Sequence, residues 1–239
     1  MTNAERFIAA YNKIDSLLRS IYGVDVRVSF TEVVRRTAKK SSVIAACEYK
    51  LIDYARLRNA IVHQGTREEI IAEPHTDVVE DFENIAALIA SPPNAYERVA
   101  KKKVLTLSGD VTIKEAIRAM YESGYSNVPV TKAGRLIGVL NNKLIVDTLA
   151  RSAARGENID IFASEHRISG ILLESMEGVY YAILPRSASV TDILDLFNSN
   201  RKMLCALITE NGNGREKPIG IITSADIWEL NDIIDNYNI

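Results

Sequence analysis

The sequence predicts an α+β fold in which an all-helical N-terminal part precedes two copies of a β-α-β-β-α unit. Apolar residues recur at three- and four-residue spacing through the first 90 residues, which is the period of a helix. The segments that begin at Thr112 and at Ser189 align without a gap at a constant separation of 77 residues. An internal repeat predicts two structural units of one kind, and a duplicated unit of this length commonly encloses a cleft. Ligand sensing is therefore the first functional hypothesis, ahead of catalysis.

Helices alone are expected in the N-terminal part. The apolar spacing predicts them over residues 4–21, 42–62 and 77–90, with a short helix or turn over 30–38. The segment Ser91-Pro92-Pro93 follows the last of them, and a Pro-Pro pair cannot continue a helix. We therefore expect an N-terminal helical bundle over 1–93, a first repeat over 94–158 and a second repeat over 159–239. The run Lys101-Lys102-Lys103 is expected to be a solvated linker at the entry to the repeats.

Each repeat opens with a capped helix and continues with two strands. Thr112-x-x-Glu115 and Ser189-x-x-Asp192 have the pattern of a capping box, in which each side chain satisfies a free backbone N–H at a helix start. Short apolar runs then predict paired strands over 127–130 and 136–140 in the first copy, and over 203–208 and 218–222 in the second. A second helix is expected to begin near Asn142 and near Ser224.

The second copy is five residues longer than the first. Pro129 and Ala206 still stand 77 residues apart, whereas Gly138 and Gly220 stand 82 apart. The additional residues fit the polar segment 210–217, which is rich in Asn and Gly. Lengthening a loop by this amount costs little free energy, so both strands of the second copy are expected to be kept.

Three of these features together resemble a tandem cystathionine-β-synthase (CBS) domain pair, also called a Bateman module. They are the capped helix, the Asn-Val-Pro-Val run at 127–130 and the ending Gly-Ile-Ile-Thr-Ser-Ala-Asp-Ile at 220–227. The resemblance covers roughly residues 100–235 and includes both copies. It implies a regulatory protein that binds an adenine-type nucleotide such as AMP or ATP, with no resident cofactor.

The ligand-binding residues implied by this resemblance lie at the end of the second copy. Thr223, Ser224 and Asp226 stand where a strand gives way to a helix, and free N–H groups at such a point favour an anionic ligand group. In CBS domains the Thr and the Asp of this motif bind the ribose and phosphate of an adenine nucleotide. The resemblance extends a phosphate-binding role to Arg201 and Lys202, which precede the second strand.

Two observations limit this interpretation. Thr223-x-x-Asp226 is also a capping-box arrangement, which needs no ligand. In the first copy, Asn141 stands in place of Thr223 and Leu144 in place of Asp226, and Leu144 cannot accept a hydrogen bond from a ribose. We therefore expect one functional nucleotide site per chain, and a first copy whose site is weak or empty.

The third predicted helix contains the run Arg58-Asn59-Ala60-Ile61-Val62-His63, which resembles the Arg-x(4–6)-His motif of HEPN domains. This resemblance covers residues 1–93. It implies a dimer and, in active members, a metal-independent RNase with Arg58 and His63 as the catalytic pair and Asn59 as an orienting group. A histidine can move a proton on or off a ribose hydroxyl, and an arginine can stabilise the phosphate charge.

Two functions of different class therefore stay open. The first is a regulatory nucleotide-binding protein that signals through a helical dimerisation domain, and the alternative is an RNase of the HEPN type gated by nucleotide, with RNA as its substrate. A third possibility is a dimerisation module in which both sites are inactive. On a helix, Asn59 and His63 would share a face that points away from the apolar seam, and Arg58 would lie beside that seam.

Composition excludes several other classes. The chain carries 29 basic and 31 acidic residues, so whole-chain charge does not indicate a nucleic-acid-binding protein. It has no apolar run long enough for a membrane span and no signal-peptide pattern at its start, so a cytoplasmic location is expected. Cys47 and Cys205 lie on apolar elements of different domains, and we expect buried thiols instead of a disulfide. No metal-ligand spacing is present, and a homodimer is expected because both resembled families dimerise through helices.

Overall fold

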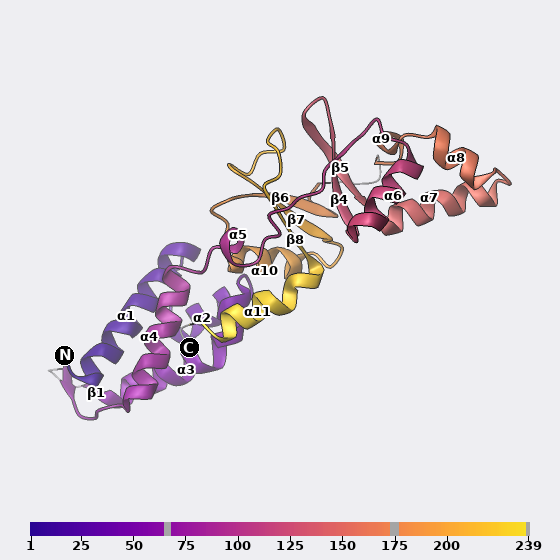
Figure 1. The fold of residues 1–239 in the computed structure, drawn as a ribbon. Helices are drawn as coiled ribbons and strands as arrows, with labels where there is room; N and C mark the ends of the chain where they lie inside the picture. The colour runs from indigo at the N-terminus through magenta and orange to yellow at the C-terminus, as the bar shows by residue number, and fades with distance from the viewer. Residues whose placement is uncertain (65–67, 173–176, 238–239) are drawn as a thin grey trace. The chain divides into compact units, whose positions relative to one another are not determined.

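The computed structural model describes residues 1–64, 68–172 and 177–237 and confirms the α+β class (Figure 1). The chain divides into two compact units. The first unit, called the helical unit below, contains Met1–Pro93, Ser189–Asn198 and Leu230–Ile239. The second unit, called the repeat unit, contains Asn94–Ala188 and Ser199–Glu229.

The helical unit begins with the helices that the apolar spacing predicts. They are α1 (Asn3–Tyr22), α2 (Phe30–Ala38), α3 (Ser42–Ile61) and α4 (Thr76–Ala90). Helix α1 starts at a capping box formed by Thr2 and Glu5 and ends at Gly23, whose φ of 63° lies in the left-handed region that favours glycine. Aromatic side chains pack across the bundle, with the rings of Phe7 and Phe82 4.7 Å apart between α1 and α4. Both rings are fully buried, so they anchor the core of this unit.

The predicted third helix ends earlier than the sequence analysis expects. Helix α3 stops at Ile61, and the chain continues as a short strand β1 (Val62–Gln64) that pairs antiparallel with β2 (Glu68–Ile70). Val62 is extended, with φ −107° and ψ 116°, and its β-branched side chain is 2% exposed. Burial in an extended conformation favours the strand at this position. The expectation that His63 sits on the helix is therefore wrong, and Gly65, expected as the helix stop, lies outside the described residues.

Two later segments of the chain complete the helical unit. Helix α10 (Val190–Ser199) contacts α3 through Ser42, whose backbone N–H donates to Asp195 at 2.6 Å and whose hydroxyl accepts from Asn198 at 2.7 Å. Near the end of the chain, the Tyr237 hydroxyl donates to the carbonyl of Ser91 at 3.1 Å. This residue follows α11 (Ile227–Asp235). The helical unit is therefore assembled from three separate stretches of sequence.

The repeat unit contains two three-stranded sheets of the same topology. One is built from β3 (Leu107–Ser108), β4 (Asn127–Lys132) and β5 (Arg135–Asn141), and the other from β6 (Tyr181–Pro185), β7 (Cys205–Thr209) and β8 (Gly220–Thr223). In each sheet the first strand pairs parallel with the middle strand, and the last strand pairs antiparallel with it. This identity of order and direction confirms the internal repeat in three dimensions.

Helices connect and flank these strands. They are α5 (Ala95–Arg98), α6 (Ile113–Ser123), α7 (Asn142–Ala154), α8 (Ile159–Glu165), α9 (Ile168–Ile171) and the 3-10 turn η2 (Ser224–Asp226), which leads into α11. The predicted capping box at the start of α6 is present, since Thr112 and Glu115 each bond the backbone of the other. Helix α7 begins at Asn142, as predicted.

Strand β7 lies in the core of the repeat unit. Every residue of β7 is buried, and Cys205 within it is 0% exposed, which raises the pKa of its thiol to about 12. Cys47 in the helical unit is half-buried, and desolvation raises the pKa of its thiol also. Both cysteines are free thiols. The expected burial is confirmed for Cys205, whereas Cys47 is only partly buried. Thiols with a raised pKa are poor nucleophiles at neutral pH.

The extra residues of the second copy form the loop between β7 and β8, as the alignment predicts. Glu216 folds this loop back on itself, because its carboxylate accepts from the backbone and the side-chain amide of Asn211, each at 2.8 Å. Those hydrogen bonds lower the pKa of the Glu216 carboxyl. The insertion is accommodated outside the strands and leaves the sheet pairing intact.

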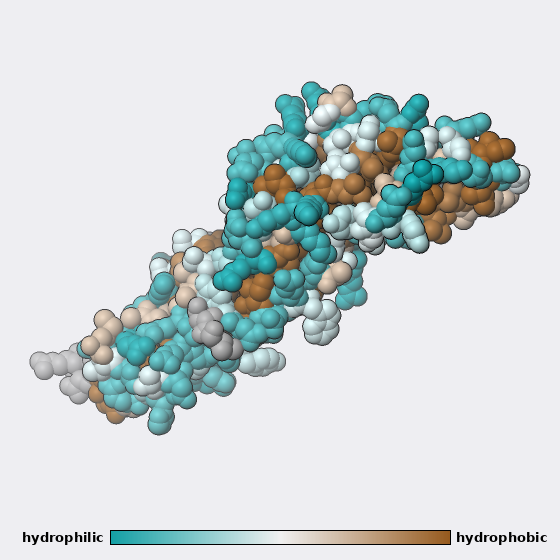
Figure 2. All heavy atoms as spheres, in the orientation of Figure 1, coloured by the Kyte–Doolittle hydropathy of each residue, from teal (hydrophilic) through white to brown (hydrophobic). Residues whose placement is uncertain are grey.

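Among the described helices, none combines the length and the apolar character that a membrane crossing requires. Hydrophilic residues cover much of the face shown in Figure 2, and apolar residues reach its surface around α7 and α8. Val146 on α7 and Ile161 on α8 are 62% and 55% exposed. An exposed apolar area on a surface is a common sign of an interaction site.

Candidate ligand-binding site

A pocket lies where β8 ends and η2 begins. Its volume is about 340 Å³, which is within the range of small-molecule sites. Three stretches of the repeat unit line it: Lys101, Lys103, Val104 and Leu105; Gly124, Tyr125, Ser126 and Asn127; and Ile221, Thr223, Ser224 and Ala225. We call it pocket A. It brings together the end of the second copy, the segment before β4 of the first copy and the linker that precedes both.

Asp226 lies behind Thr223 at the base of this region and is 9% exposed. One of its carboxylate oxygens accepts from the backbone N–H of Thr223 at 2.7 Å and from the Thr223 hydroxyl at 2.8 Å. The other oxygen lies 3.1 Å from the Nζ of Lys101. The capping role that the sequence left open is therefore present in this structure. A ligand that uses Asp226 has to compete with these internal partners.

The segment 101–103 is solvent-exposed, as expected, and two of its three lysines also line pocket A. Lys101 pairs with Ile221 at the edge of β8, since the two residues exchange backbone hydrogen bonds of 3.0 and 3.2 Å. The chain bends at Lys102, and Lys101 and Lys103 line pocket A, whereas Lys102 does not.

Lys102 is held elsewhere by α5. Its Nζ lies 3.1 Å from a carboxylate oxygen of Glu97 and 5.0 Å from the centre of the Tyr96 ring. Arg186 contacts the same two residues, at 3.0 Å from Glu97 and 4.7 Å from the ring centre. Hydrogen bonds from Arg186 and then from Lys102 lower the pKa of the Glu97 carboxyl. These contacts hold the Lys102 side chain against α5, and Lys102 does not line pocket A.

A second pocket of about 280 Å³ lies at the corresponding place of the first copy. Its lining residues are Asn141, Lys143, Leu144, Asp147, Tyr180, Arg201, Lys202 and Leu204. We call it pocket B. The repeat separations relate the two pockets, because Asn141 corresponds to Thr223 and Tyr180 to Lys103. Leu144 stands where the second copy has Asp226, and its backbone N–H donates to the side chain of Asn141 at 2.9 Å.

The residues proposed for a single site therefore fall into two places. Thr223 and Ser224 line pocket A with Asp226 directly behind them, whereas Arg201 and Lys202 line pocket B. Each pocket is formed by both copies, because the segment before the middle strand of one copy faces the end of the last strand of the other. Gly124 and Tyr125 are the residues that correspond to Arg201 and Lys202, and they line pocket A.

Lys101 and Lys103 are not predicted from the sequence as site residues. The three consecutive lysines show positive charge beside the apolar residues Val104 and Leu105, but not which of them line a pocket. Nothing in the sequence shows that this segment meets the end of β8, because that pairing joins residues 120 positions apart.

The Arg58-Asn59-x-x-x-His63 residues lie on two elements of the helical unit. Arg58 and Asn59 are in the last turn of α3, and His63 is on β1, in register with Glu69. The guanidinium carbon of Arg58 lies 5.7 Å from the centre of the Tyr11 ring, so Arg58 packs toward α1. Asn59 is exposed. RNase activity and RNA binding stay predictions of the sequence.

Within residues 1–64, 68–172 and 177–237, no group of three or more His, Cys, Asp or Glu side chains is arranged to hold a metal ion.

Comparisons with known proteins agree with the repeated topology. The family model of the CBS domain matches residues 97–151 and again 180–227. A search of curated proteins found no significant match.

The solved structures that match part of this chain include CBS domain proteins. A CBS domain protein from Streptococcus pneumoniae TIGR4 is 15% identical with a TM-score of 0.45, and the match covers 69% of this chain and 97% of that one. A CBS-domain protein from Agrobacterium tumefaciens is 18% identical with a TM-score of 0.43, covering 57% and 89%. The CBS domain of a bacterial CNNM/CorC family Mg²⁺ transporter in complex with ATP is 18% identical with a TM-score of 0.44, covering 62% and 92%.

The matched residues contain both three-stranded sheets, the helices between their strands and most of the lining of pockets A and B. Residues 97–151 and 180–227 of this chain are therefore a pair of CBS domains.

Proposed function

We propose that the CBS domain pair binds an adenine nucleotide such as AMP or ATP in pocket A and that the chain is a regulatory protein. One site per chain carries this function. The observation that supports it is the meeting, in one pocket, of two lysines with the Thr223-Ser224 turn. Lysines attract phosphate, and hydroxyl and carboxylate groups bind a ribose diol. The preference for adenine comes from the CBS family and not from a contact in this structure.

Pocket A is better suited to a nucleotide than pocket B. Behind its turn lies the carboxylate of Asp226, which can accept from a ribose hydroxyl that displaces an internal partner, whereas pocket B has Leu144 at the same position. The side of pocket A formed by Gly124, Tyr125 and Ser126 is uncharged, while Arg201 and Lys202 place positive charge on the equivalent side of pocket B. A base can enter the first more readily than the second.

The test is calorimetric titration of the full chain with AMP, ADP and ATP, with GTP as a comparison, together with thermal unfolding at millimolar ligand. A ligand that binds only the folded state raises the unfolding midpoint. The variant Ala225→Glu places a carboxylate in the lining of pocket A, on an exposed residue, so it should remove binding without disturbing the core.

The matched control is Lys143→Glu, which makes the same charge at the corresponding position of pocket B. It should leave nucleotide binding unchanged. Loss of binding in Lys143→Glu with retention in Ala225→Glu would move the site to pocket B. Absence of heat and of any midpoint shift with all four nucleotides would refute nucleotide sensing.

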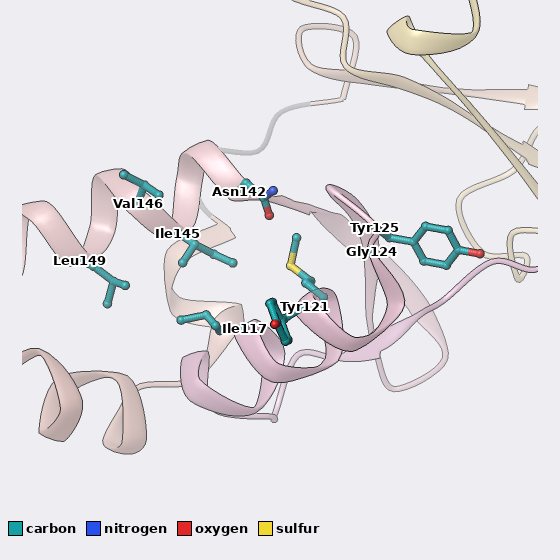
Figure 3. A pocket seen from close by; sticks show the side chains of 9 residues that line it. Ile117, Tyr121, Gly124, Tyr125, Asn142, Ile145, Val146 and Leu149 are labelled. Carbon is teal, nitrogen blue, oxygen red and sulfur yellow. The ribbon is translucent and has the colours of Figure 1, made fainter.

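We further propose that two chains associate through the outer face of the first copy. An apolar groove of about 520 Å³ runs between α6 and α7. Figure 3 shows Ile117 of α6 and Ile145 of α7 pointing toward each other across it. Tyr121 and Val146 at its rim are 87% and 62% exposed, which is unusual for large apolar side chains in a groove.

Internal symmetry supports a second chain as the occupant of this groove. Helix α10 corresponds to α6, and it has partners within the helical unit: Asp195 and Asn198 both bond Ser42. Leu194 is 3% exposed, whereas Ile117, its counterpart on α6, is only half-buried. At this position the first copy is therefore more open than the second.

Analytical ultracentrifugation tests this association. Tyr121→Glu and Val146→Glu should each shift the chain from dimer to monomer, because a buried unpaired carboxylate is costly. Tyr49→Glu is the control, since Tyr49 is 84% exposed on α3 of the helical unit. A wild-type chain that sediments as a monomer at high micromolar concentration would contradict the proposal.

A further inference from the structure

We infer that Lys101 and Lys103 determine the charge of the ligand that pocket A accepts, and that Lys101 exchanges Asp226 for a ligand phosphate when the site fills. This inference rests on the proposed use of pocket A and specifies how it distinguishes a phosphorylated ligand from the corresponding nucleoside.

The first step is the placement of the two side chains. The backbone of Lys101 is fixed by two hydrogen bonds to Ile221, and the chain bends at Lys102. Lys101 and Lys103 both line pocket A, whereas Lys102 does not. Two cations that share one small pocket raise its potential and favour an anionic ligand.

Second, among the described residues, only one of the two lysine charges in pocket A is neutralised by a carboxylate. Lys101 is half-exposed and is paired with Asp226 at 3.1 Å, so one of the two cations is already compensated. Within the part of the chain that the structure describes, no carboxylate lies within ion-pair distance of Lys103. Pocket A therefore carries one uncompensated positive charge before a ligand arrives. A ligand with at least one phosphate neutralises it, whereas a neutral nucleoside does not.

The third step concerns Asp226. Each of its two oxygens already has a partner, Thr223 or Lys101, and the side chain is 10% exposed, so a ribose diol that binds the carboxylate competes with one of them. Thr223 is held through both its backbone N–H and its hydroxyl, while Lys101 is held by a single contact from a flexible, half-exposed side chain. Lys101 is the partner that yields. Its ammonium group then remains in pocket A, where the phosphate of the same ligand can pair with it.

Lys102 provides a matched control within the same three residues. It has the same charge and nearly the same sequence context, but Glu97 and Tyr96 hold its side chain and it does not line pocket A. If positive charge near the site acted only at long range, substitution of any of the three lysines would weaken binding equally. If the lysines contact the ligand directly, only substitution of Lys101 or Lys103 weakens binding.

The experiment is isothermal titration calorimetry of the full chain and of the variants Lys101→Met, Lys102→Met and Lys103→Met. The probes are adenosine, AMP and inorganic pyrophosphate, at low and at high salt. Methionine keeps much of the length of the lysine side chain. A charge-assisted hydrogen bond to phosphate corresponds to a loss of about ten- to a hundredfold in affinity when it is removed.

The expected result is that AMP binds wild-type protein more tightly than adenosine. Lys101→Met and Lys103→Met should each weaken AMP and pyrophosphate binding by at least about tenfold and leave adenosine unchanged or, for Lys101→Met, tighter. Lys102→Met should behave as wild type, and the AMP affinity should fall with added salt. Equal affinities for adenosine and AMP, or equal losses in all three variants, would overturn the inference.

The same data separate the inference from the proposed function. If adenosine and AMP bind equally, the nucleoside site stands and the lysines do not read charge. If pyrophosphate binds in a manner that depends on Lys101 and Lys103 while neither adenine compound binds, the lysine inference stands and the adenine proposal fails. If none of the three probes binds wild-type protein, both are wrong.

Discussion

Gly220, the first residue of β8, packs directly against Ala100 in the linker that leads to pocket A. A Cβ atom added at Gly220 would lie 3.1 Å from the Cβ of Ala100 and 3.1 Å from the Tyr96 ring. Gly220→Ala is therefore expected to lower the free energy of unfolding by about 1–3 kcal/mol through overpacking. Urea unfolding followed by circular dichroism measures it. Gly170→Ala is the control, because a Cβ there meets nothing within 4 Å, and an equal loss in both variants would contradict the packing explanation.

The capping box of α6 makes a second prediction. Thr112→Ala removes the hydroxyl that accepts from the Glu115 backbone N–H at 3.2 Å, and it should cost about 1 kcal/mol of stability. Thr112→Ser keeps the hydroxyl and should lie close to the wild type. Chemical denaturation of the three proteins is the measurement, and indistinguishable midpoints for Ala and wild type would show that this cap contributes nothing.

Much of this fold follows from local signals in the sequence. The capping boxes and the apolar spacing predict the starts of α6 and α7, and the constant separation of the copies predicts the two matching sheets. The end of α3 does not follow, because Val62 is extended through its burial and through pairing with β2. A helix pattern alone contains no information about that partner strand.

The candidate site was harder to predict than the fold. Thr223 and Asp226 can be named from their motif, and the structure places them together. The position of Arg201 in pocket B, and of Lys101 in pocket A, depends on how the two copies face each other and on the pairing of Lys101 with Ile221. These are contacts between residues distant in sequence, which periodicity and capping rules do not encode.

A third prediction concerns the helical unit. The hydroxyl of Tyr54 on α3 donates to Asp81 on α4, and Lys50 lies 2.8 Å from the other oxygen of that carboxylate. Burial, followed by the hydrogen bond to Asp81, raises the pKa of Tyr54. Tyr54→Phe keeps the ring in its contact with Phe82 and removes only this bond, so it should cost about 1–2 kcal/mol. Thermal and urea unfolding provide the measurement, and a change within error would show that the bond is replaced by water.

A fourth prediction concerns the stability of the fold at low pH. Hydrogen bonds from Arg155 and then from Ser152 lower the pKa of Glu157 to about 2. A carboxyl whose folded pKa is depressed stabilises the fold above its unfolded pKa, and that contribution is lost as the pH falls through the folded value. The wild type should therefore exceed Glu157→Gln in stability at pH 6, and the gap should close between about pH 4 and pH 2. Unfolding midpoints across this range test it, with Glu122→Gln as an exposed control.

The helical unit is assembled from three stretches of sequence, and this has a consequence for biosynthesis. Chains emerge from the ribosome from the N-terminus onward, so α1 to α4 are available long before α10 and Tyr237. Until those later segments are made, Ser42 and Ser91 lack the partners that they have in the folded protein. A nascent chain that stalls within the repeats therefore leaves the helical unit unfinished.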